Sequence, residues 1–287
     1  THDVSATEST ATYNTAYGIA AMDAITTGDH NVAIGADALS GAADGENNTA
    51  IGSSALYSVT SGDGNVAIGR QAGDALTTGS HSVAIGMSAL STEDAGTGAI
   101  AIGYQALQDQ DGGDTFNVAV GYRAGRNVTT GTNNILIGAS AGDTLTTGHY
   151  NVAIGHQALK TEDAHGRNVA IGHQALETLD AGADAYNVAI GYDAGTAMTT
   201  GLKNTLIGAS AGIAMTDSYY NVAVGFESLK TSTGYGYNTA VGYQSLYTLN
   251  ATGGNGYNVA VGFQAGYGVT SGVKNTIIGS LAGDALT

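Results

Sequence analysis

The chain has 287 residues, of which 45 are glycine and none is proline, cysteine or tryptophan, and its formal net charge is -16. This charge argues against a nucleic-acid-binding protein, because phosphate contacts need lysine and arginine. The lack of cysteine excludes a disulfide scaffold, a thiolate metal site and a cysteine nucleophile. No apolar run reaches the roughly 18 residues of a membrane span, so we expect no membrane insertion.

Residues 1–13 are polar, and we expect them to form an extended lead-in. From residue 14 to residue 287 the motif N-V-A-I-G recurs with variants in sixteen copies. Successive motif glycines lie 17 residues apart in twelve of fifteen intervals, and 18, 19 or 20 apart in the others. These glycines are Gly18, Gly35, Gly52, Gly69, Gly86, Gly103, Gly121, Gly138, Gly155, Gly172, Gly191, Gly208, Gly225, Gly242, Gly262 and Gly279. The sequence therefore predicts a single repeat domain over residues 14–287.

Each position before the motif glycine forms a column of similar residues. The third residue before it is always β-branched, the second is Ala in thirteen copies, and the first is Ile or Val in fifteen. In a strand the β-branched and Ile columns share one face, and the Ala column and the preceding Asn column share the other. One short strand per 17 residues predicts an all-β fold, a parallel β-solenoid of about 16 coils. The Asn column predicts amides that hydrogen-bond from coil to coil.

A coil of 17 residues has room for few inward side chains, which is a thin core for an isolated chain. We therefore interpret the Ala column as a flat stripe that packs against copies of the chain in a side-by-side or intertwined homotrimer. Leu or Ile replaces Ala in one of every four coils, which we interpret as a larger apolar plug in the same seam. The predicted seam residues are Ala33, Ala67, Ala101, Leu136, Ala153, Ala170, Leu206, Ala223 and Ile277.

The three longer coils place their extra residues at 108–116, 177–186 and 247–257, and we expect these loops to point outward, because loops tolerate insertions. Aromatic residues recur just before the strands. They either stack on sugars of a receptor or cover the edge of the coil, and we favour the second interpretation. The predicted surface-contact residues are Phe116, Tyr150, Tyr186, Tyr220, Tyr237 and Tyr257, and Tyr13 shares their column.

No Ser-His-Asp set and no phosphate-binding loop stands out, so we predict no enzyme and assign no catalytic, cofactor-binding or metal-binding residue. His156 and His173 share one column, and we interpret them as surface histidines rather than metal ligands or pH sensors. Acidic loops contain Glu93-Asp94, Glu162-Asp163 and residues 109–114. We interpret these loops as solvated turns, with Ca²⁺ binding as the alternative.

The repeat N-V-A-I-G-x-x-A-L with T-T-G turns, as at residues 31–39, 151–159 and 238–246, resembles the YadA-like head repeat of trimeric adhesins. Similar arrays occur in phage tail-fibre proteins. The resemblance covers residues 14–287, and it implies a left-handed parallel β-roll, a homotrimer and apolar strand columns that face the core of the roll. The period of 17 is longer than that of adhesin heads, so the turns differ.

We therefore expect a non-enzymatic, extracellular fibre shaft or head, adhesive or structural, on a virion appendage or a bacterial surface. Its receptor would be a cell-surface glycan or protein. One alternative is a head-to-tail filament subunit, because the last copy ends without a polar cap. The other is an ice-binding solenoid, which needs a flat Thr face. Thr pairs such as Thr77-Thr78 and Thr129-Thr130 skip the long-loop coils, so that face is interrupted.

Overall fold

The computed structural model describes residues 10–41, 44–234, 236–250 and 254–286. These residues form one three-residue strand per repeat. The first eight are β1 (Thr15–Tyr17), β2 (Val32–Ile34), β3 (Thr49–Ile51), β4 (Val66–Ile68), β5 (Val83–Ile85), β6 (Ile100–Ile102), β7 (Val118–Val120) and β8 (Ile135–Ile137). The others are β9 (Val152–Ile154), β10 (Val169–Ile171), β11 (Val188–Ile190), β12 (Thr205–Ile207), β13 (Val222–Val224), β14 (Thr239–Val241), β15 (Val259–Val261) and β16 (Thr276–Ile278). Within the described part, no helix is long and apolar enough to cross a membrane.

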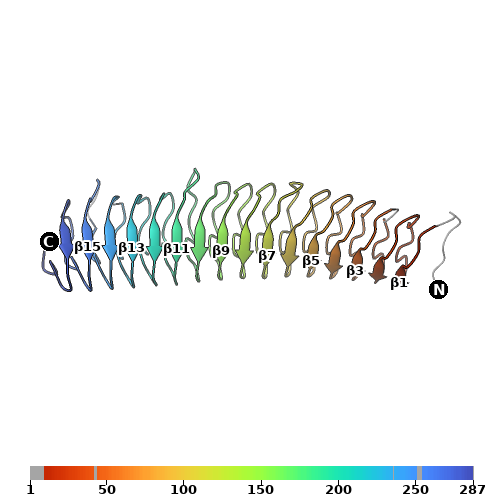
Figure 1. The fold of residues 1–287 in the computed structure, drawn as a ribbon, viewed down its shortest axis with the longest axis horizontal. Helices are drawn as coiled ribbons and strands as arrows, with labels where there is room; N and C mark the ends of the chain where they lie inside the picture. Colours follow the sequence, from red (N-terminus) through yellow and green to blue (C-terminus); the bar gives the residue numbers. More distant parts are fainter. Residues whose placement is uncertain (1–9, 42–43, 235, 251–253, 287) are drawn as a thin grey trace. The chain divides into compact units, whose positions relative to one another are not determined.

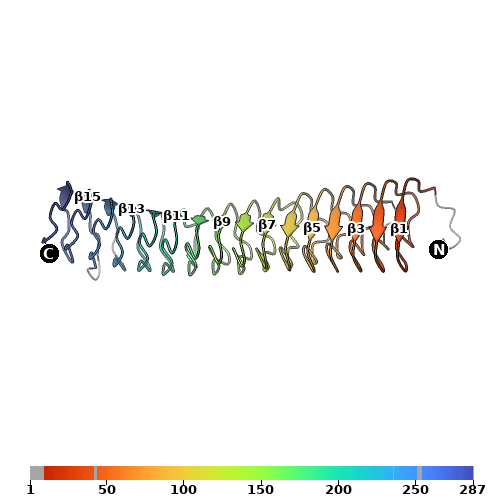
Figure 2. The same cartoon turned by 90° about the horizontal axis from the view of Figure 1, so that it is seen from below.

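The chain divides into two compact units, residues 1–147 with β1 to β8 and residues 148–287 with β9 to β16. Within each unit neighbouring strands pair in parallel, in chain order and in register, so that Ala33 pairs with Ala50 and Ala153 with Ala170. In Figure 2 the strands of the first unit lie side by side, with one strand in each coil. The prediction of an all-β parallel solenoid with one strand every 17 residues is confirmed.

The predicted lead-in, residues 1–13, lies mostly outside the described residues. In its described part, the Thr10 amide donates a hydrogen bond to the Thr26 carbonyl, and the Tyr13 ring stacks on His30.

The Ala column faces the interior of the coil. From β2 to β16 the middle residue of each strand is buried, whereas its two neighbours are partly exposed. The interior also receives the Ala three residues after the motif glycine and the Leu that often follows it, such as Ala158 and Leu159. A second buried position lies seven residues after the glycine and holds Leu76, Leu145 or Met198 among others. This second position is not predictable from periodicity, because the surrounding turn residues follow neither a strand nor a helix pattern.

The position four after the glycine combines a left-handed backbone with a place in the buried interior, and together these account for its Leu, Gly and single Met. Leu159 has φ 50° and Gly142 has φ 58°. Such a conformation costs a residue with a side chain about 1–2 kcal/mol, whereas full burial of a Leu side chain contributes about 1.5–3 kcal/mol. Leu is therefore tolerated where its side chain fills the core, and Gly stands where another side chain fills that space.

Around several of these glycines the other side chain is one of the larger strand residues, Leu136, Leu206 or Ile277. A Cβ added to Gly125 would lie 2.6 Å from Leu136 Cδ1, and one added to Gly142 would lie 2.8 Å from Leu136 Cδ2. Leu206 and Ile277 are related in the same way to the glycines of their own coils, Gly212 and Gly283. The interpretation of these residues as a plug between chains is wrong, because they fill core volume that glycine leaves open in their own unit.

The Asn column forms a buried ladder. Asn31 Oδ1 accepts a 2.8 Å hydrogen bond from the main-chain N–H of Asn48 in the next coil. The side-chain Nδ2 of Asn48 donates to the Gly62 carbonyl at 2.8 Å across its own coil. In the second unit the Asn side-chain amides also hydrogen-bond to one another; for example, Asn204 Nδ2 donates to Asn187 Oδ1 at 3.2 Å. The prediction of coil-to-coil amide bonds is confirmed.

The motif glycine permits this close stacking. Gly208 has φ +136°, and an added Cβ there would lie 2.5 Å from the Gly225 carbonyl oxygen in the next coil. A side chain does not fit at that distance, and all sixteen motif glycines have φ between 126° and 149°, a region that disfavours residues with a side chain.

Candidate interaction surface

The predicted seam residues lie in the interior of each unit and not on its surface. Their exposed fraction is 0% for all except Ile277, at 7%. These residues are Ala33, Ala67, Ala101, Leu136, Ala153, Ala170, Leu206, Ala223 and Ile277. Their assignment to a seam between chains is therefore a correction to the sequence analysis: a side chain wholly covered by its own chain has no surface left to offer a second copy. The resemblance implies that apolar strand columns face the core: the Ala column does so, whereas the β-branched and Ile columns are only partly buried.

The opposite face of the strands, unlike the Ala column, is accessible to solvent. We call it the outer strand face, and it consists of the first and third residues of each strand. No charged residue occurs in either column in any of the sixteen strands. Ile135 is 40% exposed and Ile207 is 36% exposed, and most other members are half-buried. Each unit therefore presents an uncharged and mainly apolar strip along its strands, of the kind that marks interaction sites.

The predicted contact residues Phe116, Tyr150, Tyr186, Tyr220, Tyr237 and Tyr257 are all exposed, with exposed fractions of 40–54%. All six have a left-handed backbone just before the strand, with φ between 51° and 60°. We call this position the tyrosine column. In the second unit it also holds Arg167, Lys203 and Lys274.

The tyrosine column is a stack of rings and cations. Tyr237 stacks on Tyr220 and on Tyr257 with ring centres 5.0 Å apart in each case. The Arg167 guanidinium lies 5.2 Å from the Tyr150 ring centre and 5.6 Å from that of Tyr186. Partial desolvation in the stack raises the pKa of Tyr237. Because neighbouring rings and cations cover the ring faces, the edges and hydroxyls remain for contact. This geometry favours the interpretation that the rings cover the coil edge over stacking on sugars.

Arg167 also forms an ion pair with a residue beside this column. Its Nε lies 2.8 Å from Asp184 Oδ2, and the hydrogen bond from Arg167 lowers the pKa of the Asp184 carboxyl. Both side chains are exposed, so the pair adds order to the edge rather than much stability.

A second ring column follows the strand, one residue after the motif glycine. His173 stacks between His156 and Tyr192, with ring centres 5.3 and 4.9 Å away. Phe226, Tyr243 and Phe263 form a similar stack further along the unit. The two histidines therefore lie in an aromatic stack, as surface residues, and His173 Nδ1 lies 3.3 Å from Asp193 Oδ1.

Two of the acidic loops are not solvated turns. Glu93 and Glu162 are both wholly buried, and burial raises the pKa of each carboxyl. Glu93 lies where Ser82 and Ala99 interrupt the Asn ladder. Its carboxylate accepts hydrogen bonds from the Gly96 amide at 2.7 Å and from Gln110 Nε2 at 3.0 Å. The expectation of solvated glutamates failed because position seven after the glycine points inward.

The extra residues of the longer coils do extend outward. A Cβ added at Gly113, Gly182 or Gly254 would meet no atom within 4 Å. Figure 1 shows the loop that precedes β11 rising beyond its neighbours in the second unit. Residues 251–253 of the third loop lie outside the described residues.

Comparisons with protein-family models, with curated proteins and with solved structures find no match to this chain. The fold and the surfaces described above therefore carry the functional argument.

Proposed function

We propose that the chain is a non-enzymatic, extracellular fibre shaft or head, a left-handed β-roll that assembles as a homotrimer and presents its edges to a receptor. The observation that carries this proposal is the outer strand face, an uncharged strip repeated in every coil of a chain whose net charge is -16. The resemblance of the repeat to trimeric adhesin heads and phage tail-fibre arrays supports the same function.

A second and a third copy of this chain are the occupants that we propose for the outer strand face. The two columns of the face repeat at the spacing of the coils, so a parallel copy offers the same apolar rows at the same intervals. Burial of apolar surface of this kind contributes roughly 25 cal/mol per Å². The proposed interface between the chains is therefore formed by the β-branched and Ile columns and not by the Ala column.

The tyrosine column and the outward loops are the proposed receptor-facing elements. Ring edges, phenolic hydroxyls and the cations Arg167, Lys203 and Lys274 make a surface suited to weak contacts that gain strength by repetition. A cell-surface glycan or protein remains the proposed receptor class.

Two observations bear on the alternative functions. In the pairs Thr77-Thr78 and Thr129-Thr130 the first hydroxyl is engaged within the chain: Thr77 Oγ1 donates to the Asp94 carbonyl at 3.1 Å and Thr129 Oγ1 to the Thr146 carbonyl at 3.2 Å. Hydroxyls bound in this way are a poor template for ice, which ranks the ice-binding function low. A head-to-tail filament subunit stays the second proposal, since stacked coils can continue from one chain to the next.

The test is the mass of the assembly in solution, measured by sedimentation equilibrium. The parent chain should have three times the 28.5 kDa mass of one chain. Ile207→Arg, on the outer strand face, should yield monomers, because each charge would be desolvated in the seam. Thr200→Arg, an equal change on an exposed turn, should keep the trimer. A monomeric parent, or a trimer that survives Ile207→Arg, would refute this seam.

A further inference from the structure

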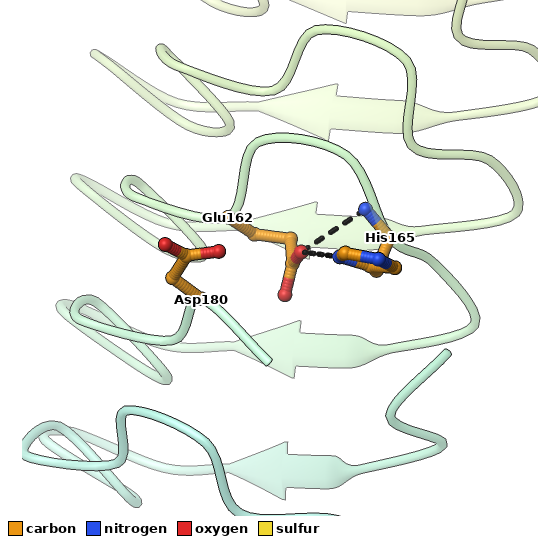
Figure 3. A group of neighbouring side chains, drawn as sticks. All are labelled: Glu162, His165 and Asp180. Carbon is orange, nitrogen blue, oxygen red and sulfur yellow. Dashed lines mark hydrogen bonds and ion pairs between the residues drawn. The ribbon is translucent and has the colours of Figure 1, made fainter. Parts of the chain in front are cut away.

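Glu162, His165 and Asp180 converge from the turns of two successive coils of the second unit (Figure 3). Each offers one ligand atom, and these atoms all lie within 4.8 Å of one another. The Glu162 carboxylate is wholly buried, and its Oε1 lies 3.5 Å from His165 Nδ1. The main chain holds this carboxylate in place, because the His165 amide donates to Oε1 at 3.1 Å and the Ala181 amide to Oε2 at 3.4 Å.

One ring nitrogen of the imidazole lacks a hydrogen-bond partner. His165 Nδ1 is buried and makes no hydrogen bond to any described residue. It points at a carboxylate that is itself removed from water, and a second carboxylate, Asp180, lies on the exposed side of the same group. A buried carboxylate and a buried ring nitrogen that face one another are stabilised by a cation or a proton between them.

The first unit contains the same acidic pair without the histidine. Glu93 and Asp111 occupy the places of Glu162 and Asp180 relative to their motif glycines, and Gly96 stands where His165 does. There Gln110 Nε2 donates to Glu93 Oε2 at 3.0 Å, and Gln110 Oε1 accepts from Asn117 Nδ2 at 2.9 Å. An amide thus satisfies the buried carboxylate of the first unit.

The second unit has no such amide at the equivalent place. Leu179 occupies the place of Gln110, and His165 stands at the place of Gly96. The exchange removes a hydrogen-bond donor and supplies a metal ligand at one and the same carboxylate. A structural role alone would be served by the arrangement around Glu93.

We propose that Glu162, His165 and Asp180 bind a divalent transition-metal ion, with Zn²⁺ as the probe. In a tetrahedral zinc site with bonds of about 2.1 Å, neighbouring ligand atoms lie about 3.4 Å apart. The 3.5 Å between Glu162 Oε1 and His165 Nδ1 fits that spacing. Asp180 is exposed and reaches the ion by a rotation of its side chain, and water takes the fourth position. The imidazole favours Zn²⁺ over Ca²⁺, which takes oxygen ligands.

The bound ion would join two successive coils at a turn. Glu162 belongs to the coil of β9 and Asp180 to the coil of β10, and the ion would link them through side chains alone. Metal that binds only the folded chain raises its stability by mass action.

The experiment is calorimetric titration of the full, chelator-treated chain with ZnCl₂, together with its thermal midpoint at each metal ratio. We expect one site of this kind per chain and a higher midpoint with metal. His165→Gly, which copies the first unit, and Asp180→Asn, on an exposed turn, should each weaken binding at least about tenfold. Glu93→Gln is the matched control and should leave zinc affinity unchanged.

His156 and His173 offer zinc a rival surface site, so His156→Gln is measured beside the other variants. Loss of zinc binding in His165→Gly and Asp180→Asn, with binding kept in His156→Gln and Glu93→Gln, supports the proposal. If the parent binds no zinc, or His165→Gly binds it as tightly as the parent does, the proposal is overturned, and the three residues are an ion-pair cluster. Circular dichroism of each variant separates loss of the site from loss of the fold.

Discussion

Leu206→Ala tests directly which strand face is the core. Leu206 is the middle residue of β12 and is wholly buried. Added Cβ atoms on Gly195 and Gly212 would lie 2.8 and 3.0 Å from its terminal carbons, so this one side chain fills the space that both glycines leave open. Since neither glycine has a side chain that can collapse into the cavity, we expect a loss of about 3–5 kcal/mol in local stability.

Hydrogen exchange of the amides of β11 to β13 measures this loss coil by coil, which suits a solenoid that need not unfold in one step. A loss of about 3 kcal/mol corresponds to exchange roughly 100-fold faster. Leu206→Ala with Gly212→Leu rebuilds the Ala-and-Leu pairing of other coils and should recover part of the loss. It will not recover all of it, because the left-handed backbone at Gly212 costs Leu about 1–2 kcal/mol.

The matched single change, Gly212→Leu, should itself destabilise the coil by about 1–3 kcal/mol through overpacking against Leu206. The losses of local stability in the two single variants should therefore add up to more than the loss measured in the double variant. If Leu206→Ala leaves exchange in β11 to β13 unchanged and alters only the mass of the assembly, this strand face belongs to an interface and the assignment of the core is wrong.

Three further changes have expected outcomes. Asn187→Ala should cost about 2–4 kcal/mol in local stability, seen as faster hydrogen exchange, because it leaves a buried amide and a buried carbonyl unpaired; normal exchange in β11 and β12 would contradict the ladder. Tyr237→Ala should cost about 1–2 kcal/mol in thermal unfolding by removing its stacking on Tyr220 and Tyr257, and an unchanged midpoint would show that the stack adds no stability. In metal-free buffer Glu162→Gln should unfold at an equal or higher temperature than the parent at pH 7. Burial raises the folded-state pKa of this carboxyl above its unfolded value, so the parent gains stability as the pH falls through the folded pKa, and the advantage of the variant should shrink there. If the difference in unfolding temperature between Glu162→Gln and the parent grows on acidification, the folded-state pKa of Glu162 is not raised and the reasoning is wrong.

The sequence was sufficient to predict the coils but not their orientation. A strand alternates with period two, and this assigns the residues beside Ala153 to one face and Ala153 to the other without stating which face is inside. The small size of Ala suggested a seam between chains, and the resemblance implied that apolar strand columns face the core. In the structure Ala153 of the strand and Leu159 of the turn are both wholly buried, whereas the β-branched and Ile residues beside Ala153 are only partly buried and lie on the outer face.

The sequence predicted the exposed residues better than it predicted the buried polar residues. The tyrosine column was visible as a repeated residue type, and its exposure is confirmed. The burial of Glu93 and Glu162 was not visible, because an acidic residue beside Asp and Gly in a turn normally indicates a solvated loop. The informative signal was the column itself: seven residues after the glycine, most other coils hold Leu, Val or Met.

A single chain of repeats contains the information needed to orient its strands, through volume compensation between columns. Leu136, Leu206 and Ile277 replace Ala only in coils that have Gly four residues after the motif glycine. Two positions that exchange volume across a turn must share one enclosed space, because exposed side chains have no volume to conserve. The residue after the motif glycine, which is also small in these three coils, is partly or fully exposed and so is not part of an enclosed space. Compensation between a strand column and a turn column therefore identifies the interior, whereas compensation between neighbouring strand-end positions does not.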